Sequence, residues 1–180
     1  MKVGFDIDGV FVDFANEIFL AALFDLTGII PNNTVPYSWD YSESFGISEE
    51  IEEQVWNSDE LLHHMEKALP IPGSLILPKM FPDHVFVTSR GTSHNAERAQ
   101  RIREITFEWV RWRLQLDAPI FFSPCSQKHT LLRQHGAEIM VEDNPIAVEL
   151  MASSGIRVLM PVYPYNEHVF HANVLRISLT

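Results

Sequence analysis

Residues 3–10, with the sequence VGFDIDGV, decide how the rest of this chain is interpreted. The apolar start predicts a short buried strand, and Asp6 and Asp8 follow it directly. Two carboxylates one residue apart in an extended segment project to the same side, where they repel each other unless a cation lies between them. Oxygen ligands of this kind suit Mg²⁺, and the pair also offers a nucleophile and a general acid and base. Gly9 lets the backbone approach a ligand closely.

Three more segments carry polar groups at positions that matter for chemistry. The apolar run 85–89 (VFVTS) ends in two hydroxyls, and the run 139–143 (IMVED) ends in two acids. Between these runs, Lys128 begins a helical pattern. Each segment alone also has an ordinary explanation, such as a solvated turn, a strand-end threonine or a solvated lysine, so their order along the chain carries the argument.

In that order the four segments resemble the motifs of the haloacid dehalogenase (HAD) superfamily of phosphatases. The resemblance implies that Asp6 attacks phosphorus and forms an aspartyl phosphate. It implies that Asp8 protonates the leaving oxygen and then activates water. The superfamily's dehalogenases lack an acid at the second position, because a halide leaves without a proton, so Asp8 argues for phosphoryl transfer.

The resemblance also assigns roles to the other two catalytic candidates. Thr88 would hydrogen-bond to the transferring phosphoryl group, with the Ser89 amide nearby. Lys128 would neutralise Asp6 and a phosphate oxygen together.

The predicted cofactor is Mg²⁺, because the available ligands are hard oxygens. The metal candidates are Asp6, Asp8 through its main-chain carbonyl, Asp143, and Glu142 through a water molecule. The superfamily often carries a second acid about four residues after the Asp143 position. Ala147 stands there instead, which leaves the rest of the metal shell open.

The pattern after about residue 70 alternates strands with helices, which predicts a parallel sheet with helices on both faces. The resemblance refines this to a three-layer, doubly wound, Rossmann-like α/β core. Thr92 or Ser93 is expected to cap the helix that follows the second strand. Later strands are predicted at residues 85–87, 119–122, 139–141, 157–160 and 174–178.

Residues 14–73 interrupt the alternation. The sequence predicts an apolar helix over residues 14–26 closed by Gly28, an acidic helix from Ser48, and a further helix over residues 59–67. An insertion of this size between the first two strands resembles the superfamily's helical cap, which closes over the site and selects the substrate. We therefore expect a core of residues 1–13 and 74–180 and a cap of residues 14–73.

Aromatic residues in the insertion indicate where a substrate binds. Trp39 and Phe45 lie in a polar, turn-like stretch, which favours a substrate face, whereas Trp56 is expected in the cap's own core. Together with Gly9, Ser89 and Arg90, the first two form the predicted substrate-binding set. Arg90 has two open interpretations, a grip on phosphate or a sugar hydroxyl and a capping role.

The arrangement as a whole resembles the 5'(3')-deoxyribonucleotidase branch of the superfamily. Arg90 is one departure, because the animal enzymes of that branch carry proline there. The resemblance implies a Mg²⁺-dependent phosphatase acting on a small phosphate ester, with (deoxy)nucleoside 5'-monophosphates favoured. The alternatives are a phosphatase for a sugar phosphate or another small metabolite, and a catalytically silent phosphate-binding protein.

Composition limits the partners. The chain has 180 residues, 46% of them hydrophobic, which suits one domain with a substantial core. A formal net charge of -11 disfavours nucleic-acid polymers and anionic membranes as partners. The only cysteine, Cys125, fits a reducing compartment, and no stretch resembles a signal peptide, so we expect a cytoplasmic protein. The oligomeric state stays open.

Overall fold

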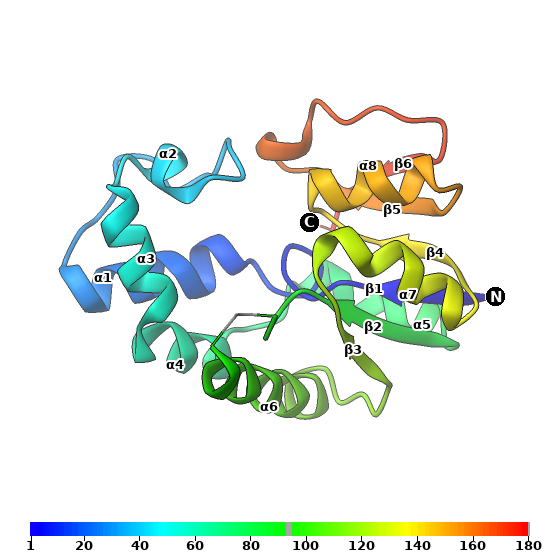
Figure 1. Ribbon diagram of the computed structural model, residues 1–180, viewed down its shortest axis with the longest axis horizontal. Helices are drawn as coiled ribbons and strands as arrows, with labels where there is room; N and C mark the ends of the chain where they lie inside the picture. Colours follow the sequence, from blue (N-terminus) through cyan, green and yellow to red (C-terminus); the bar gives the residue numbers. More distant parts are fainter. Residues whose placement is uncertain (93–94, 180) are drawn as a thin grey trace.

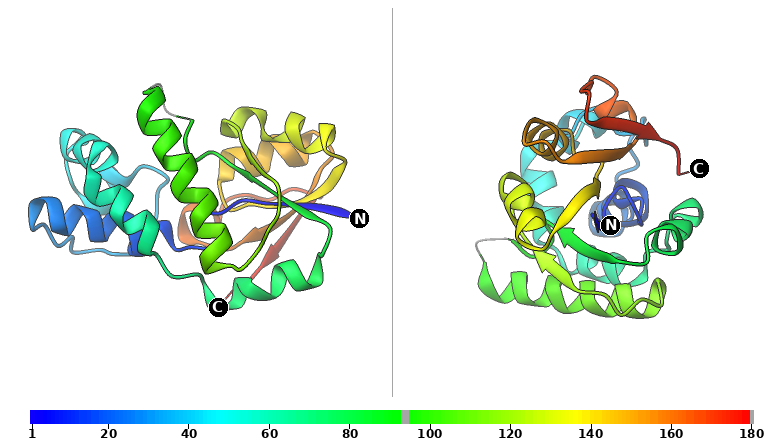
Figure 2. Two further views of the ribbon diagram at one scale, coloured as in Figure 1. Left: turned by 90° about the horizontal axis from the view of Figure 1, so that it is seen from below. Right: turned by 90° about the vertical axis from the view of Figure 1, so that its right-hand side faces the viewer.

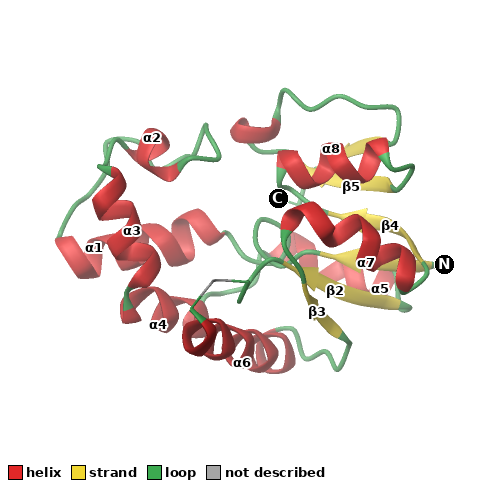
Figure 3. Ribbon diagram, in the orientation of Figure 1, coloured by secondary structure: helices red, strands yellow, loops and turns green. Residues whose placement is uncertain are grey.

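The computed structural model describes residues 1–92 and 95–179. Within these residues six parallel strands form one sheet in the order β3-β2-β1-β4-β5-β6 (Figures 1 and 3). The predicted doubly wound parallel sheet is therefore confirmed. The strands are β1 (Lys2–Phe5), β2 (His84–Thr88), β3 (Ile120–Phe122), β4 (Ala137–Val141), β5 (Arg157–Pro161) and β6 (Val174–Ile177).

The order of the strands places a switch point between β1 and β4. The chain adds β2 and β3 on one side of β1, and then adds β4, β5 and β6 on the other side. Ligands of such sheets bind outside the carboxyl ends of the strands at this point. Phe5 is level with Val141, and the Asp6 amide donates to the Val141 carbonyl at 2.9 Å. The residues after β1 and β4 therefore meet.

Successive side chains of each strand point to opposite faces of the sheet. Because the strands consist mainly of apolar residues, both faces of the sheet are apolar. Val3 and Phe5 belong to one buried cluster, whereas Val85 and Val87 belong to the other. Helices α5 (Leu77–Met80) and α6 (Ala96–Arg113) contribute to the first cluster, and α7 (Lys128–Gln134) and α8 (Pro145–Ser153) to the second (Figure 2).

The segment between β1 and β2 is helical, as the sequence predicts. A π-helix η1 (Phe14–Leu20) continues into α1 (Ala21–Thr27), which ends at Gly28 in the left-handed conformation with φ 72°. Ser48 and Ser58 accept backbone hydrogen bonds and cap the next two long helices. Figure 1 shows these helices beyond the carboxyl ends of the strands. The helices here are η1, α1, α2 (Tyr41–Phe45), α3 (Glu49–Asn57) and α4 (Asp59–Lys67).

Helix α6 anchors this insertion to the sheet. The buried Trp109 indole donates to the Ala68 carbonyl at 2.9 Å, and Arg98 donates to the carbonyls of Trp56 and Ser58 at 2.7 and 2.8 Å. Phe19 of the insertion belongs to the same buried cluster as the sheet residues, so the insertion and the sheet share one core.

One predicted helix start needs correction. The side chain of Asn95, not of Thr92, caps α6, and it accepts from the Arg98 amide at 3.0 Å. Thr92 instead donates to the Ser89 carbonyl within the preceding loop. The other candidate, Ser93, lies outside the described residues. The described residues also form three short 3₁₀ helices: η2 (Pro72–Ile76), η3 (Cys125–Gln127) and η4 (Pro164–Asn166). None of the described helices is long and apolar enough to cross a membrane.

Candidate active site

A buried lysine connects the ends of β1 and β4. Lys128 Nζ donates to Asp6 Oδ2 and to Glu142 Oε2, each at 2.7 Å, and the lysine side chain is fully buried. Burial alone lowers the pKa of Lys128, but the two adjacent carboxylates outweigh it and hold that pKa above its ordinary value. The structure therefore places a permanent positive charge against the predicted nucleophile.

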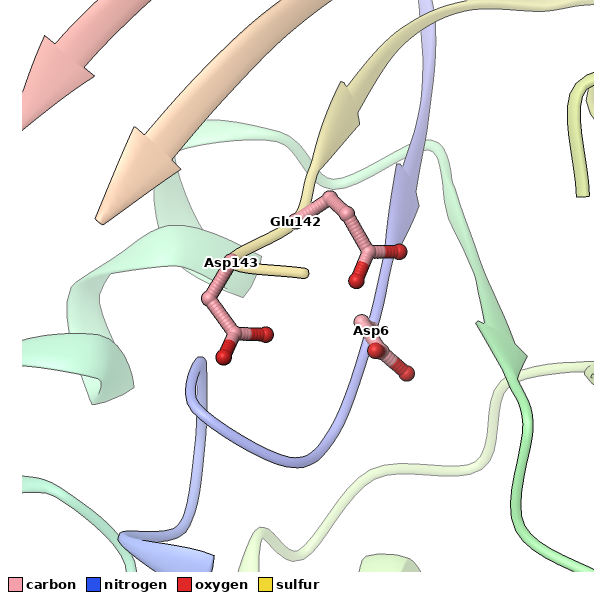
Figure 4. Close-up of side chains that lie close together, drawn as sticks. All are labelled: Asp6, Glu142 and Asp143. Atoms are coloured by element: carbon pink, nitrogen blue, oxygen red, sulfur yellow. The ribbon is translucent and has the colours of Figure 1, made fainter. Parts of the chain in front are cut away.

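Asp6, Glu142 and Asp143 form an acidic cluster that suits a metal ion. One oxygen from each lies within 4.8 Å of the others, and Figure 4 shows the three side chains directed toward a common space. Asp6 Oδ1 is buried and has no hydrogen-bond partner among the described residues. A buried carboxylate oxygen of this kind requires a partner, and a hard cation supplies one. The residues present therefore fit Mg²⁺.

Within this cluster the structure separates two roles. Glu142 accepts from Lys128 through one oxygen and from the Asn144 amide, at 3.2 Å, through the other. Its hydrogen-bonding capacity is therefore largely used in holding the lysine. Asp6 Oδ1 and the Asp143 carboxylate are the better placed metal ligands.

Burial also changes the acidity of the cluster. Burial, followed by the nearby charge of Asp6, raises the pKa of Asp143 to about 7, although a hydrogen bond from Tyr165 opposes this shift. Burial, and then Asp6, likewise raises the pKa of Glu142 well above its usual range. Buried carboxylates repel each other, and a bound cation would stabilise their charged forms.

Gly9 permits the loop after β1 to lie against Asp143. It has a φ of +68°, and a Cβ added there would lie 2.0 Å from Asp143 Oδ2. The sequence predicts that Gly9 allows a close backbone approach, and the structure identifies Asp143 as the group approached. Gly9 also lines the cavity described below.

Asp8 is not one of the three clustered acids, and it binds Arg90. Arg90 Nε donates to the two Asp8 oxygens at 3.0 and 2.9 Å, and Nη2 donates to Oδ1 as well. The guanidinium is buried 5.9 Å from the centroid of the Trp109 ring. Because Asn95 caps α6, the capping interpretation of Arg90 is not supported. The structure gives the arginine a partner that the sequence did not suggest, the predicted acid and base.

The two hydroxyls after β2 are placed differently. Thr88 is buried and its hydroxyl accepts from the Arg90 amide at 3.3 Å, whereas Ser89 lines the cavity. Ser89 Oγ donates to the Ser123 carbonyl at 3.1 Å and lies 3.1 Å from Cys125 Sγ. Ser89, rather than Thr88, therefore forms the cavity wall at this point.

A cavity of about 600 Å³ lies between the insertion and the carboxyl ends of the strands. Its size is that of pockets that bind small organic molecules. Asp6, Asp8 and Asp143 are among its lining residues, together with Arg90. Aromatic side chains form much of the remaining wall: Phe14, Trp39, Tyr41, Trp56, Tyr163 and Tyr165.

Phe45 and Trp56 occupy each other's expected surroundings, the core and the cavity. Trp39 lines the cavity as predicted, but Phe45 is 5% exposed and packs on Phe19, with ring centroids 5.8 Å apart. Phe45 is therefore not among the cavity-lining residues, because α2 turns that ring into the core. Trp56, predicted for the core, lines the cavity, is 40% exposed and stacks on Phe14 at 5.3 Å.

Sequence reasoning missed the residues that follow β5. Tyr165 donates to Asp143 Oδ2 at 2.5 Å, Tyr163 donates to the Gly9 carbonyl at 2.8 Å, and Asn166 donates to the Asp143 carbonyl at 2.8 Å. A signal was present, because these residues come directly after a predicted parallel strand. The carboxyl end of that strand had to lie beside the other strand ends.

Comparison with known proteins gives a match of structure without a match of sequence. No protein-family model matches the chain, and no curated protein matches it. A haloacid dehalogenase-like hydrolase from Streptococcus pneumoniae is similar with a TM-score of 0.56 at 18% identity, over 99% of this chain and 94% of the other.

Two further solved structures agree with this result. A HAD-superfamily hydrolase of subfamily IA from Geobacter sulfurreducens gives a TM-score of 0.52 at 14% identity, over 98% of this chain and 90% of the other. CbbY from Rhodobacter sphaeroides, solved in complex with phosphate, gives a TM-score of 0.52 at 15% identity, over 97% of this chain and 92% of the other. The chain thus has the fold of HAD-superfamily hydrolases.

Proposed function

We propose that this protein is a Mg²⁺-dependent phosphatase that hydrolyses nucleoside or deoxynucleoside 5'-monophosphates. The observation that carries the proposal is the position of Asp6. This carboxylate is paired with buried Lys128, has one oxygen beside Asp143 that bonds none of the described residues, and lines a cavity with aromatic walls. The fold of HAD-superfamily hydrolases supports the reaction class.

In the first half of the reaction, an Asp6 oxygen attacks phosphorus and forms an aspartyl phosphate. The bond between phosphorus and the ester oxygen breaks, and that oxygen takes a proton from Asp8. Lys128 remains charged beside Asp6 and offsets the negative charge that gathers there.

In the second half, Asp8 accepts a proton from a water molecule whose oxygen attacks phosphorus. The bond between phosphorus and Asp6 breaks, inorganic phosphate leaves, and Asp6 is again a carboxylate. Asp6 and Asp143 would hold Mg²⁺, with the Asp8 main-chain carbonyl added by the family resemblance. The ion supplies charge neutralisation for the phosphoryl group when it is bound.

The walls of the cavity favour a substrate with a flat, apolar part. Phe14, Tyr41 and Trp56 stack on one another there, with interplanar angles of 12° to 29°. A base that stacks on such a surface gains roughly 1–3 kcal/mol. A free sugar phosphate would need hydrogen-bond partners for each hydroxyl, which aromatic walls supply poorly.

The test is release of inorganic phosphate, with Mg²⁺ and with EDTA, from nucleoside monophosphates, sugar phosphates and an aryl phosphate. We expect release that requires Mg²⁺ and is fastest with nucleotides. Faster release from a sugar phosphate would keep the mechanism and overturn the substrate. Mg²⁺ and nucleotide binding by the folded protein without any release would instead favour a phosphate-binding protein.

A further inference from the structure

The turn that follows β5 is hydrogen-bonded to Asp143 of the acidic cluster and to Gly9, which packs on Asp143. This tyrosine turn, residues 163–166, reaches the loop after β1 through Tyr163 and the end of β4 through Tyr165 and Asn166. It belongs to none of the four segments on which the proposed chemistry rests. Two of its contacts are to a candidate metal ligand and to the glycine that packs on that ligand.

Asp143 is held from three directions. The Tyr165 hydroxyl donates to Oδ2 at 2.5 Å, the Asn166 amide holds the main-chain carbonyl at 2.8 Å, and Gly9 packs directly on the carboxylate. Ala147, one turn into α8, is a fully buried apolar residue and donates nothing to the site. Tyr165 therefore supplies the side-chain hydrogen bond that fixes the direction of the Asp143 carboxylate.

The tyrosine turn is itself held by buried hydrogen bonds and ring stacking. Asn166 is fully buried, accepts from the Tyr163 amide at 2.9 Å and donates to the Pro161 carbonyl at 2.9 Å. The rings of Tyr163 and Tyr165 stack with centroids 5.2 Å apart and an interplanar angle of 11°. A hydroxyl presented from such a base has little freedom, so it can orient the group that it bonds.

We propose that Tyr165 is a positioning residue for the metal site, which orients Asp143 toward the cation. Partners that hold metal ligands in this way typically contribute 10- to 100-fold to metal affinity. The inference rests on the proposed function only in that it requires a cation at the acidic cluster, and it is independent of the substrate.

The experiment is calorimetric titration of Mg²⁺ into the full chain, compared with Tyr165→Phe and Tyr37→Phe. We expect Tyr165→Phe to weaken binding about 10- to 100-fold. Tyr37→Phe is the matched control, because it also removes one hydroxyl that donates to the protein, here to the Glu43 carbonyl at 2.9 Å, and Tyr37 does not line the cavity. It should bind Mg²⁺ as the natural chain does.

The outcomes separate the two proposals. A natural chain that binds no Mg²⁺ contradicts the proposed function. A natural chain and a Tyr165→Phe variant that bind equally well overturn only the role of Tyr165. In an Asp143→Asn background, the further change Tyr165→Phe should cost little affinity, whereas an undiminished loss there would show that the hydroxyl acts elsewhere.

A second measurement does not depend on the folding of Tyr165→Phe. Because a cation bound by Asp143 changes the charge on the carboxylate that accepts from the Tyr165 hydroxyl, Mg²⁺ should change the near-ultraviolet absorbance of tyrosine in the natural chain and in Tyr37→Phe. The change should be absent in Asp143→Asn. Mg²⁺ binding by calorimetry without any tyrosine signal in the natural chain would overturn the inference.

Discussion

At the scale of single residues, Asp6 is the group on which the proposed chemistry depends. Asp6→Asn should reduce phosphate release by about 10³-fold or more, because an amide cannot act as the nucleophile. Phosphate release under saturating Mg²⁺, with thermal unfolding to verify the fold, measures this effect. Asp25→Asn is the control, because Asp25 is a half-exposed carboxylate that bonds only His64 among the described residues. Activity retained in Asp6→Asn would refute the aspartyl-phosphate route.

Two glycines allow backbone strain to be separated from crowding of the site. Gly9 and Gly28 both have positive φ, but a Cβ at Gly28 meets nothing within 4 Å, whereas one at Gly9 meets Asp143. Each change to alanine should cost roughly 1–2 kcal/mol from the left-handed conformation. Only Gly9→Ala should also weaken Mg²⁺ binding, because it displaces a ligand. Urea unfolding and calorimetry measure the two effects, and equal Mg²⁺ affinity in both variants would contradict this account.

At the scale of elements, α6 joins the insertion to the sheet. Trp109→Phe removes the buried indole donor and leaves the Ala68 carbonyl without that partner, which should lower the free energy of unfolding by about 1–3 kcal/mol. Trp112→Phe on the same helix is the control, because Trp112 is 71% exposed. It should change stability by less than about 0.5 kcal/mol. Equal losses for the two variants in urea unfolding would argue against this anchoring bond.

At the scale of the whole molecule, metal binding and stability are linked through the raised pKa of Asp143. This pKa is about 7 in the folded protein and ordinarily near 4, so the folded state favours the protonated form. The resulting stabilisation is complete below the unfolded pKa and is lost as the pH rises through 7. Mg²⁺ binds the ionised form and replaces that proton.

Mg²⁺ should therefore raise Tm more at pH 8 than at pH 6. Thermal unfolding at both values, with Mg²⁺ and with EDTA, measures the difference, and Asp143→Asn should reduce its pH dependence. A larger gain in Tm at pH 6 would contradict the assignment of Asp143 as a metal ligand.

Local patterns in the sequence were sufficient for much of this protein. The apolar runs ending in Asp6 and Glu142 are short-range signals, and so are Gly28 and Ser48 at helix ends, so the parallel sheet and the helical insertion follow from the sequence. Because the carboxyl ends of parallel strands share one edge, the meeting of Asp6 with Asp143 follows as well.

Only the tertiary structure decided which side chains complete the site. The local sequence favours a substrate face for Phe45 and a core position for Trp56, but the packing of α2 and α3 sends the Trp56 ring to the cavity and the Phe45 ring to the core. Arg90 and Asp8 lie 82 positions apart in the sequence, and Tyr165 and Asp143 lie 22 positions apart. Such contacts depend on the direction in which each loop leaves the sheet, and no local pattern of residues specifies that direction.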